Sequence, residues 1–119
     1  MQSNNKTFVN DTIIIGAHTF KNCTFGDNCS IDDESQFDNC TFGNNCKFGI
    51  GSYFYNVNTF GNNCKFGIDS TFCHYDACTF GDDCTYDECV EFDDDDNEFV
   101  IVKRCDNDEI VDRRAINVV

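Results

Sequence analysis

The heptapeptide Cys23-Thr24-Phe25-Gly26-Asp27-Asn28-Cys29 recurs along this chain with few changes. Its later copies are Cys40-Thr41-Phe42-Gly43-Asn44-Asn45-Cys46, Asn58-Thr59-Phe60-Gly61-Asn62-Asn63-Cys64 and Cys78-Thr79-Phe80-Gly81-Asp82-Asp83-Cys84. Within each copy a shorter unit is visible: a small residue, a polar residue, Phe or Ile, Gly or Asp, and two polar residues. Repetition of a short unit is typical of solenoid proteins, in which each unit packs on its neighbours.

The spacing of the large apolar residues predicts the number of sides of the solenoid. Of the 14 intervals between these residues, 11 are six residues, two are five and one is eight. The irregular intervals all fall on the third step of a group of three, which predicts a coil with three sides. The residues in question are Phe8, Ile14, Phe20, Phe25, Ile31, Phe37, Phe42, Phe48, Phe54, Phe60, Phe66, Phe72, Phe80, Tyr86 and Phe92.

The fold predicted is therefore all-β, a single-domain three-sided parallel β-helix over residues 1–93 with a short N-terminal lead at 1–5. Its five coils are expected at 6–22, 23–39, 40–57, 58–77 and 78–93. Side chains alternate along a strand, so the apolar residue and the small residue two before it point inward. Gly, Asn and Asp are expected at the corners, where they adopt positive φ most easily. Residues 94–119 are predicted to form an acidic linker and a C-terminal cap.

Units such as Cys46-Lys47-Phe48-Gly49-Ile50-Gly51 resemble the hexapeptide repeat of left-handed parallel β-helix proteins, small-x-aliphatic-Gly-x-x. The resemblance covers roughly 6–93 and implies a left-handed helix, although Phe stands here where that family prefers Ile, Val or Leu. The Cys-x-Phe triplets and the five-residue steps are also similar to pentapeptide-repeat proteins, which form a right-handed, four-sided helix. The interval pattern favours three sides, while handedness stays open between the two families.

Composition and charge limit the functions that fit. The 119 residues carry 22 acidic and 8 basic side chains, a net charge of −14 that opposes direct binding to nucleic acid or an anionic membrane. No apolar run approaches the roughly 18 residues of a membrane span. The first residues show no signal-peptide pattern, so a cytoplasmic location is expected.

The ten cysteines and two histidines point to structure more than to chemistry. Most cysteines occupy inward positions and are expected to be reduced core residues, without disulfides or zinc. Cys89 and Cys105 lie off these positions, and whether they pair is open. Hexapeptide acyltransferases use a histidine as general base, a role for which His74 is the only candidate here, since His18 is expected at an inward position of the first coil. No cofactor or metal is predicted.

Two surfaces are candidates for binding a partner. The first is acidic, and the second is a flat face formed by a row of threonines. The acidic residues are Asp32, Asp33, Glu34, Asp82, Asp83, Asp87, Glu88, Glu91, Asp93, Asp94, Asp95 and Asp96. The threonines are Thr7, Thr24, Thr41, Thr59 and Thr79, and four of them are followed two residues later by Gly. β-Preference alone also explains threonine on a strand surface.

The C-terminal residues read differently from the repeats. Glu98–Val102 is predicted as a strand, and Asp106–Glu109 resembles a capping box that starts a helix. This segment is expected to seal the last coil, or to form a homodimer through its apolar stripe. An end-to-end contact is also plausible at the N-terminal end, where little chain covers the first coil.

These observations favour a non-enzymatic acidic β-helix that acts by protein–protein contact. Quinolone-resistance pentapeptide-repeat proteins and some phage anti-defence proteins (the anti-CRISPR class of viral inhibitor) are acidic mimics of DNA. The chain is similar to them in size and acidity. That resemblance implies an inhibitor of a nucleic-acid-binding protein. The alternatives are a structural or self-assembly module and, less favoured, a small hexapeptide acyltransferase.

Overall fold

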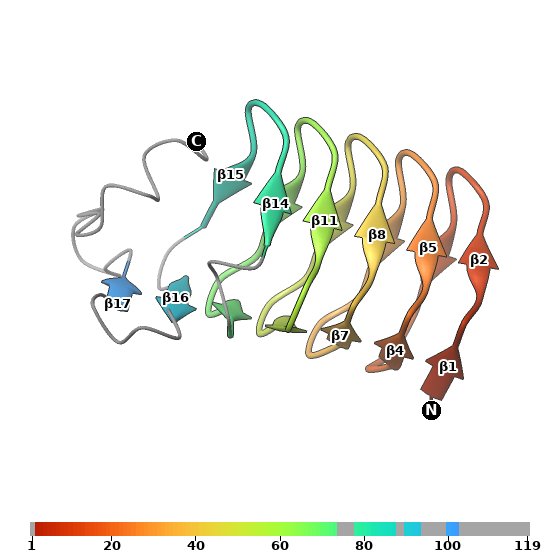
Figure 1. Ribbon diagram of the computed structural model, residues 1–119, viewed down its shortest axis with the longest axis horizontal. Coiled ribbons are helices and arrows are strands. Elements are labelled where there is room, and N and C mark those ends of the chain that lie inside the picture. The colour runs from red at the N-terminus through yellow and green to blue at the C-terminus, as the bar shows by residue number, and fades with distance from the viewer. Residues whose placement is uncertain (1, 74–77, 88–89, 94–99, 103–119) are drawn as a thin grey trace.

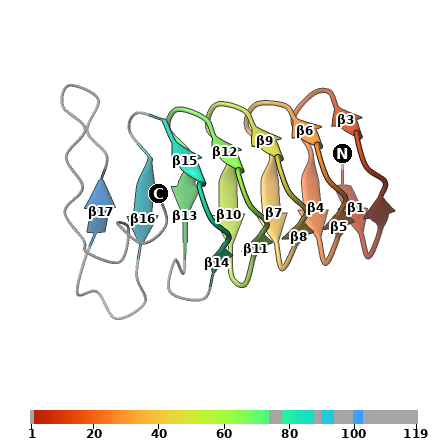
Figure 2. The ribbon, with the colours of Figure 1, turned by 90° about the horizontal axis from the view of Figure 1, so that it is seen from above.

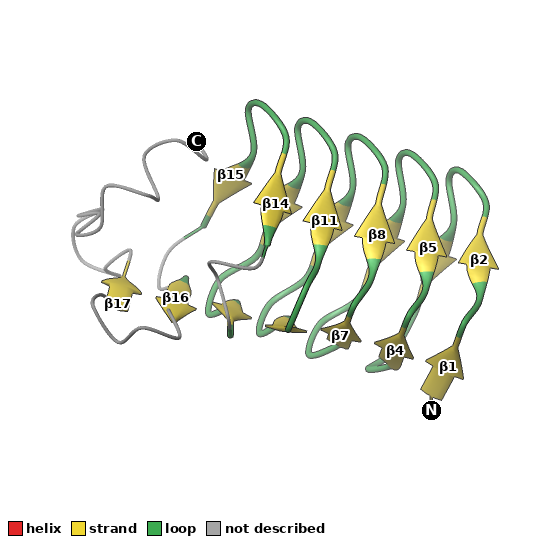
Figure 3. Ribbon diagram, in the orientation of Figure 1, coloured by secondary structure: helices red, strands yellow, loops and turns green. Residues whose placement is uncertain are grey.

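The computed structural model describes residues 2–73, 78–87, 90–93 and 100–102, and these form a parallel β-solenoid (Figure 1). All regular structure in the described residues is β-strand, as the colouring in Figure 3 shows. Short strands of two or three residues alternate with corners, and each group of three strands completes one coil. The prediction of an all-β, three-sided solenoid of about five coils is confirmed.

Three sheets run along the solenoid (Figure 2). Sheet A contains β1 (Gln2–Asn4), β4 (Thr19–Lys21), β7 (Gln36–Asp38), β10 (Tyr53–Tyr55), β13 (Thr71–Phe72), β16 (Glu91–Asp93) and β17 (Val100–Val102). Sheet B contains β2 (Thr7–Phe8), β5 (Thr24–Phe25), β8 (Thr41–Phe42), β11 (Thr59–Phe60) and β14 (Thr79–Phe80). Sheet C contains β3 (Ile13–Ile14), β6 (Ser30–Ile31), β9 (Lys47–Phe48), β12 (Lys65–Phe66) and β15 (Thr85–Tyr86).

The register stacks equivalent residues of successive coils. Thr24 pairs with Thr41, and Phe25 with Phe42, in parallel. The inward Phe rings therefore lie face to face, with ring centroids 4.9 Å apart for Phe25 and Phe42 and 5.1 Å apart for Phe42 and Phe60. Rings from neighbouring sheets meet edge-on, as Phe42 and Phe48 do at 4.8 Å and 89°. Both geometries are favourable for aromatic pairs, so the core is one aromatic stack on each side of the coil.

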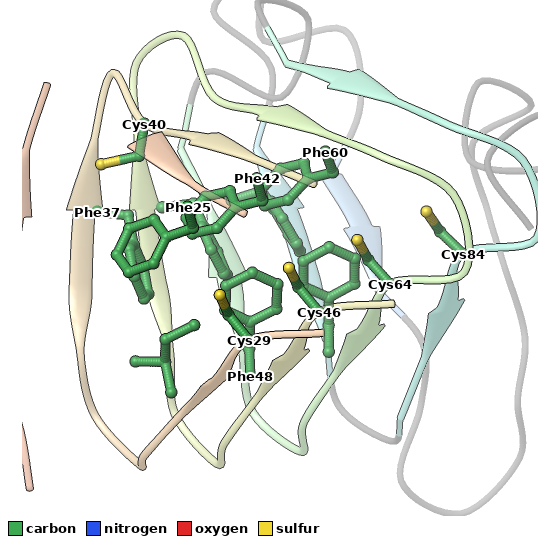
Figure 4. Close-up of a cluster of buried hydrophobic side chains, with 14 of the residues drawn as sticks. Phe25, Cys29, Phe37, Cys40, Phe42, Cys46, Phe48, Phe60, Cys64 and Cys84 are labelled. Carbon is green, nitrogen blue, oxygen red and sulfur yellow. The ribbon is translucent and has the colours of Figure 1, made fainter. Parts of the chain in front are cut away.

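Small residues complete the core beside the Phe stacks. Cys29, Cys46, Cys64 and Cys84 form one inward column, and Figure 4 shows their thiols in a row beside the rings. Ser35, Ser52 and Ser70 form a second column and are fully buried. The hydroxyls of Ser52 and Ser70 donate hydrogen bonds to the carbonyls of Gly49 and Gly67, which satisfies these buried polar groups.

Two different requirements at the corners are met by different residue types: positive φ by Asn and Asp, and close packing of successive coils by Gly. The left-handed backbone conformation falls mainly on Asn and Asp, for example Asn28, Asn45 and Asn63 at φ of 60–62°. Among the described glycines only Gly16 and Gly51 have positive φ. The expectation that glycine serves positive φ is therefore wrong at Gly61: a Cβ there would lie 2.6 Å from the carbonyl oxygen of Gly43. At that corner glycine permits close approach of successive coils.

Both ends of sheet A extend further than the repeat pattern predicted. The lead at 1–5 contains a strand, because β1 pairs in parallel with β4 through Ser3 and Phe20. At the other end β17 pairs antiparallel with β16, which confirms a strand within the predicted segment Glu98–Val102. The predicted helix from Asp106 lies outside the described residues.

Candidate contact surfaces

The threonine row, defined as Thr7, Thr24, Thr41, Thr59 and Thr79, lies on the outer face of sheet B as predicted. Each threonine is in register with the next along the row. Four of the five are exposed, and Thr59 is half-buried. The corner after each β5, β8 and β11 strand begins with a glycine, so the row borders a strip without side chains and the face is flat.

The first acidic group lies at the corner between sheets C and A in the second coil. Asp32, Asp33 and Glu34 are all exposed there. The Asp32 carboxylate accepts hydrogen bonds from the backbone N–H groups of Gly16 and Asp33, both at 2.9 Å. These two bonds favour the charged form and lower the pKa of Asp32. The Asp32 carboxylate is therefore favoured in its charged form and held in place by backbone N–H groups.

The second acidic group brackets β15 in the fifth coil. Asp82 and Asp83 precede the strand, Asp87 follows it, and all three are exposed. Glu91 and Asp93 belong to β16, but nothing is described of their side chains. The remaining predicted members, Glu88, Asp94, Asp95 and Asp96, lie outside the described residues.

The structure does not bring the two acidic groups into one row. The first lies at the corner after sheet C in the second coil, and Asp82 and Asp83 lie at the opposite edge of sheet C in the fifth. Asp87 shares the corner of Asp32, but Gly49 and Gly67 stand between them in the third and fourth coils. Between the two groups the outer face of sheet C carries Lys47 and Lys65, which are adjacent in register. Within the described residues, each group thus contributes three exposed carboxylates, at separate places along the solenoid.

Six of the eight cysteines in the described part of the chain are core residues, whereas Cys73 and Cys78 are half-buried. The free thiols of the described residues are Cys23, Cys29, Cys40, Cys46, Cys64, Cys73, Cys78 and Cys84, whereas Cys89 and Cys105 lie outside the described residues. The thiol of Cys46 donates a hydrogen bond to the carbonyl of Gly26 at 3.4 Å, and Cys84 does so to Gly61. Burial raises the pKa of Cys40 to about 11. No group of three or more His, Cys, Asp or Glu side chains in the described region is arranged to hold a metal ion.

Of the two histidines, His18 lies among the described residues and His74 does not. His18 stacks on Phe20 with ring centroids 4.5 Å apart, and its Nε2 lies 2.8 Å from the Ser3 hydroxyl oxygen. This confirms the predicted inward position with a local hydrogen bond. Burial lowers the pKa of His18. His74, the candidate general base, lies outside the described residues.

Two surface features are not predicted by the repeat pattern. A hollow of about 290 Å³ lies on sheet A, and Thr19, Lys21, Gln36, Asp38 and Tyr55 are among its lining residues. The second feature is an apolar patch at the β3 end, where Ile13 and Ile15 are 69% and 85% exposed. The repeat pattern places these isoleucines in the first coil, but it does not show that β3 has only one neighbouring strand among the described residues.

Comparison with known proteins leaves the fold as the main guide to function. No family model matches the chain, no curated protein is significantly similar to it, and no solved structure is significantly similar to the solenoid. None of the described residues forms a helix with the length and apolar character needed to cross a membrane.

Proposed function

We propose that this protein is a non-enzymatic binding module, and that its acidic surface occupies a basic site on a protein that otherwise binds nucleic acid. The observation that carries the proposal is the exposed carboxylate group of Asp82, Asp83 and Asp87 around β15. Because this chain has a net charge of −14, electrostatics favours a basic protein surface as its partner.

Rigidity of the corners supports this role. The backbone N–H of Asp82 donates to the side-chain oxygen of Asn62 at 2.8 Å, and the N–H of Asn63 donates to the carbonyl of Asp82 at 2.8 Å. The corner that presents the carboxylates is thus fixed to the coil before it. A preorganised charge loses little conformational entropy on binding, which favours affinity for a complementary site.

The burial of most described cysteines supports a role without covalent chemistry. Cys23, Cys40 and Cys46 are at most 1% exposed, and burial holds the pKa of Cys40 above the range in which thiolates form. The acyltransferase alternative depends on His74, which lies outside the described residues, so no described contact supports it.

Displacement from DNA tests the proposal directly. Proteins of a lysate are bound to DNA-cellulose at low salt, washed, and then treated with the purified protein. Mimicry predicts that specific DNA-binding proteins elute, and that elution weakens steeply as salt rises because both surfaces are charged. If the purified protein elutes nothing from the DNA-cellulose at any salt concentration, the proposal is contradicted.

A charge-matched pair of variants localises the surface. The triple change Asp82→Asn, Asp83→Asn and Asp87→Asn should abolish elution. The control is Asp11→Asn, Asp27→Asn and Asp69→Asn, which removes the same charge at other corners. The neighbouring coils carry Asn28 opposite Asp11 and Asn44 opposite Asp27, so those two corners accept Asn. An equal loss of elution in both variants would show that net charge alone causes the effect, which would contradict a defined binding site.

A structural or assembly module is the second candidate, and the flat threonine row is the observation that favours it. If a partner packs on sheet B, Thr41→Arg and Thr59→Arg should block binding of that partner, whereas the acidic triple variant should not. Binding that ignores both salt and the acidic triple variant but fails with these arginines would replace mimicry by packing on this face.

A further inference from the structure

The β1–β3 end of the solenoid leaves three strand edges with a neighbour on one side only. Within the described residues β1 pairs with β4, β2 with β5 and β3 with β6, and each is the last strand of its sheet. Figure 1 shows this end at the right, beside the N-terminus. Unpaired strand edges present backbone donors and acceptors that can pair with another chain.

Apolar side chains gather at this same end. Val9, Ile13 and Ile15 are 74%, 69% and 85% exposed. Phe8 and Ile14, the first inward residues of their sheets, are only half-buried, whereas the equivalent Phe25 is 2% exposed. A hollow of about 260 Å³ lies among Ile13, Ile14, Ile15 and Ile31. Exposed apolar surface beside open edges is the usual composition of an interface.

Charge identifies which molecule can cover this end. The coil at 6–22 contains Lys6, Lys21 and Asp11, for a net charge of +1, while the coil at 78–93 carries −6. Two copies of a chain with a net charge of −14 repel least when they meet through their first coils, because the acidic fifth coils then lie furthest apart. Head-to-tail stacking is disfavoured, since β17 runs antiparallel along the β16 edge of sheet A.

We propose that the β1–β3 end is the interface of a head-to-head homodimer. Three strands make one coil, so each strand from β1 to β3 is offset from the preceding one along the solenoid axis. The offset is about one third of the strand spacing of about 4.8 Å. A two-fold axis perpendicular to sheet B, half a strand spacing beyond the free edge of β2, places β2 beside β2 of the second copy and β1 beside β3. The offsets on either side of β2 are equal, so all three contacts close at one spacing.

This arrangement is self-complementary, as a two-fold contact requires. Paired edges are antiparallel and continue every sheet into the second copy. Phe8 then lies against Phe8 of the second copy, which extends the ring stack that begins with Phe8 and Phe25 at 4.7 Å. The contact closes after two copies and leaves the acidic surface at the far ends free. The dimer is therefore independent of the proposed mimicry.

Sedimentation velocity of the full chain at increasing concentration tests the dimer. The expected result is a species of twice the chain mass, with hydrogen exchange of the β2 and β3 amides slowing as the dimer forms. Thr7→Lys should weaken the dimer, because the register that sets Phe8 against Phe8 brings the two lysines to diagonal positions across the two-fold axis, where like charges repel. Its control is Thr41→Lys, at the equivalent exposed position of the identical Thr-Phe strand in the middle of sheet B.

The outcomes are separable. Circular dichroism shows whether both variants keep the fold, and concentration-dependent exchange in the unmodified chain reports the interface without any variant. A monomer at all concentrations overturns the proposal. So does a dimer that survives Thr7→Lys but is lost in Thr41→Lys, which would place the contact on the face of sheet B. Assemblies that grow beyond two copies would indicate head-to-tail stacking and also overturn it.

Discussion

The side-chain oxygen of Asn44 accepts a hydrogen bond from the backbone N–H of Asn62, one coil further along, at 2.8 Å. The same bond recurs at this corner from coil to coil: Asn10 accepts from Asp27, Asp27 from Asn44, and Asn62 from Asp82. The corner is therefore held by a continuous ladder of side-chain-to-backbone bonds. Asn and Asp are interchangeable as acceptors in this ladder, which explains why both occur at equivalent positions.

Removal of one acceptor from this ladder should destabilise the solenoid. Asn44→Ala leaves the Asn62 N–H without its partner, and we expect a loss of about 1 kcal/mol in the free energy of unfolding. Asn44→Asp keeps the acceptor and should cost much less. Urea unfolding of both variants measures the difference. Equal losses would show that the side chain matters for a reason other than this bond.

Gly61 tests the close approach of successive coils. A Cβ at Gly61 would meet the carbonyl oxygen of Gly43 at 2.6 Å, and backbone cannot move aside without separating the coils. Gly61→Ala should therefore lower the melting temperature markedly. Gly51→Ala is the control: its φ of 70° adds conformational strain of roughly 1–2 kcal/mol, but its nearest contact is an ordinary 3.5 Å. A smaller loss at Gly61 than at Gly51 would contradict the steric explanation.

The ring stacks predict a gradient of stability along the chain. Phe42 is 2% exposed and has rings on both sides, so Phe42→Ala should cost roughly 3–5 kcal/mol. Phe8 is half-buried and stacks on Phe25 alone within sheet B, so Phe8→Ala should cost less. Chemical denaturation of the two variants checks the order. The reverse order would mean that the first coil is the more tightly packed.

Alkaline pH should destabilise the fold through Cys40. Burial raises the pKa of this thiol from its ordinary value of 9.0 to about 11. Between these values the unfolded chain loses the thiol proton while the folded chain keeps it, so stability falls as pH rises from about 9 to about 11. Cys40→Ser should flatten this part of the profile relative to the unmodified chain. An unchanged slope, measured by urea unfolding at each pH, would assign the loss to other groups.

The architecture of the solenoid could be predicted from the amino-acid pattern, because the information that specifies it is local. Side chains alternate in a strand, so the six-residue spacing of Phe42, Phe48 and Phe54 is enough to place them inward on three successive sides. Irregular steps at every third position then fixed the number of sides. The inward cysteines followed from the same alternation, as did the register of the threonine row.

The positions of the surface residues relative to one another could not be predicted in this way, because they depend on contacts between coils. Gly61 is required by a carbonyl in the preceding coil, which no local pattern reveals. The acidic groups at Asp32 and Asp82 look alike in sequence, but three coils and a different corner separate them, with Lys47 and Lys65 between. Likewise Ile14 reads as an ordinary inward residue, and it is only half-buried because β3 has no second neighbour among the described strands, whereas the equivalent Ile31 is buried. Spacing along the chain sets the direction of a side chain, whereas stacking of coils sets its neighbours.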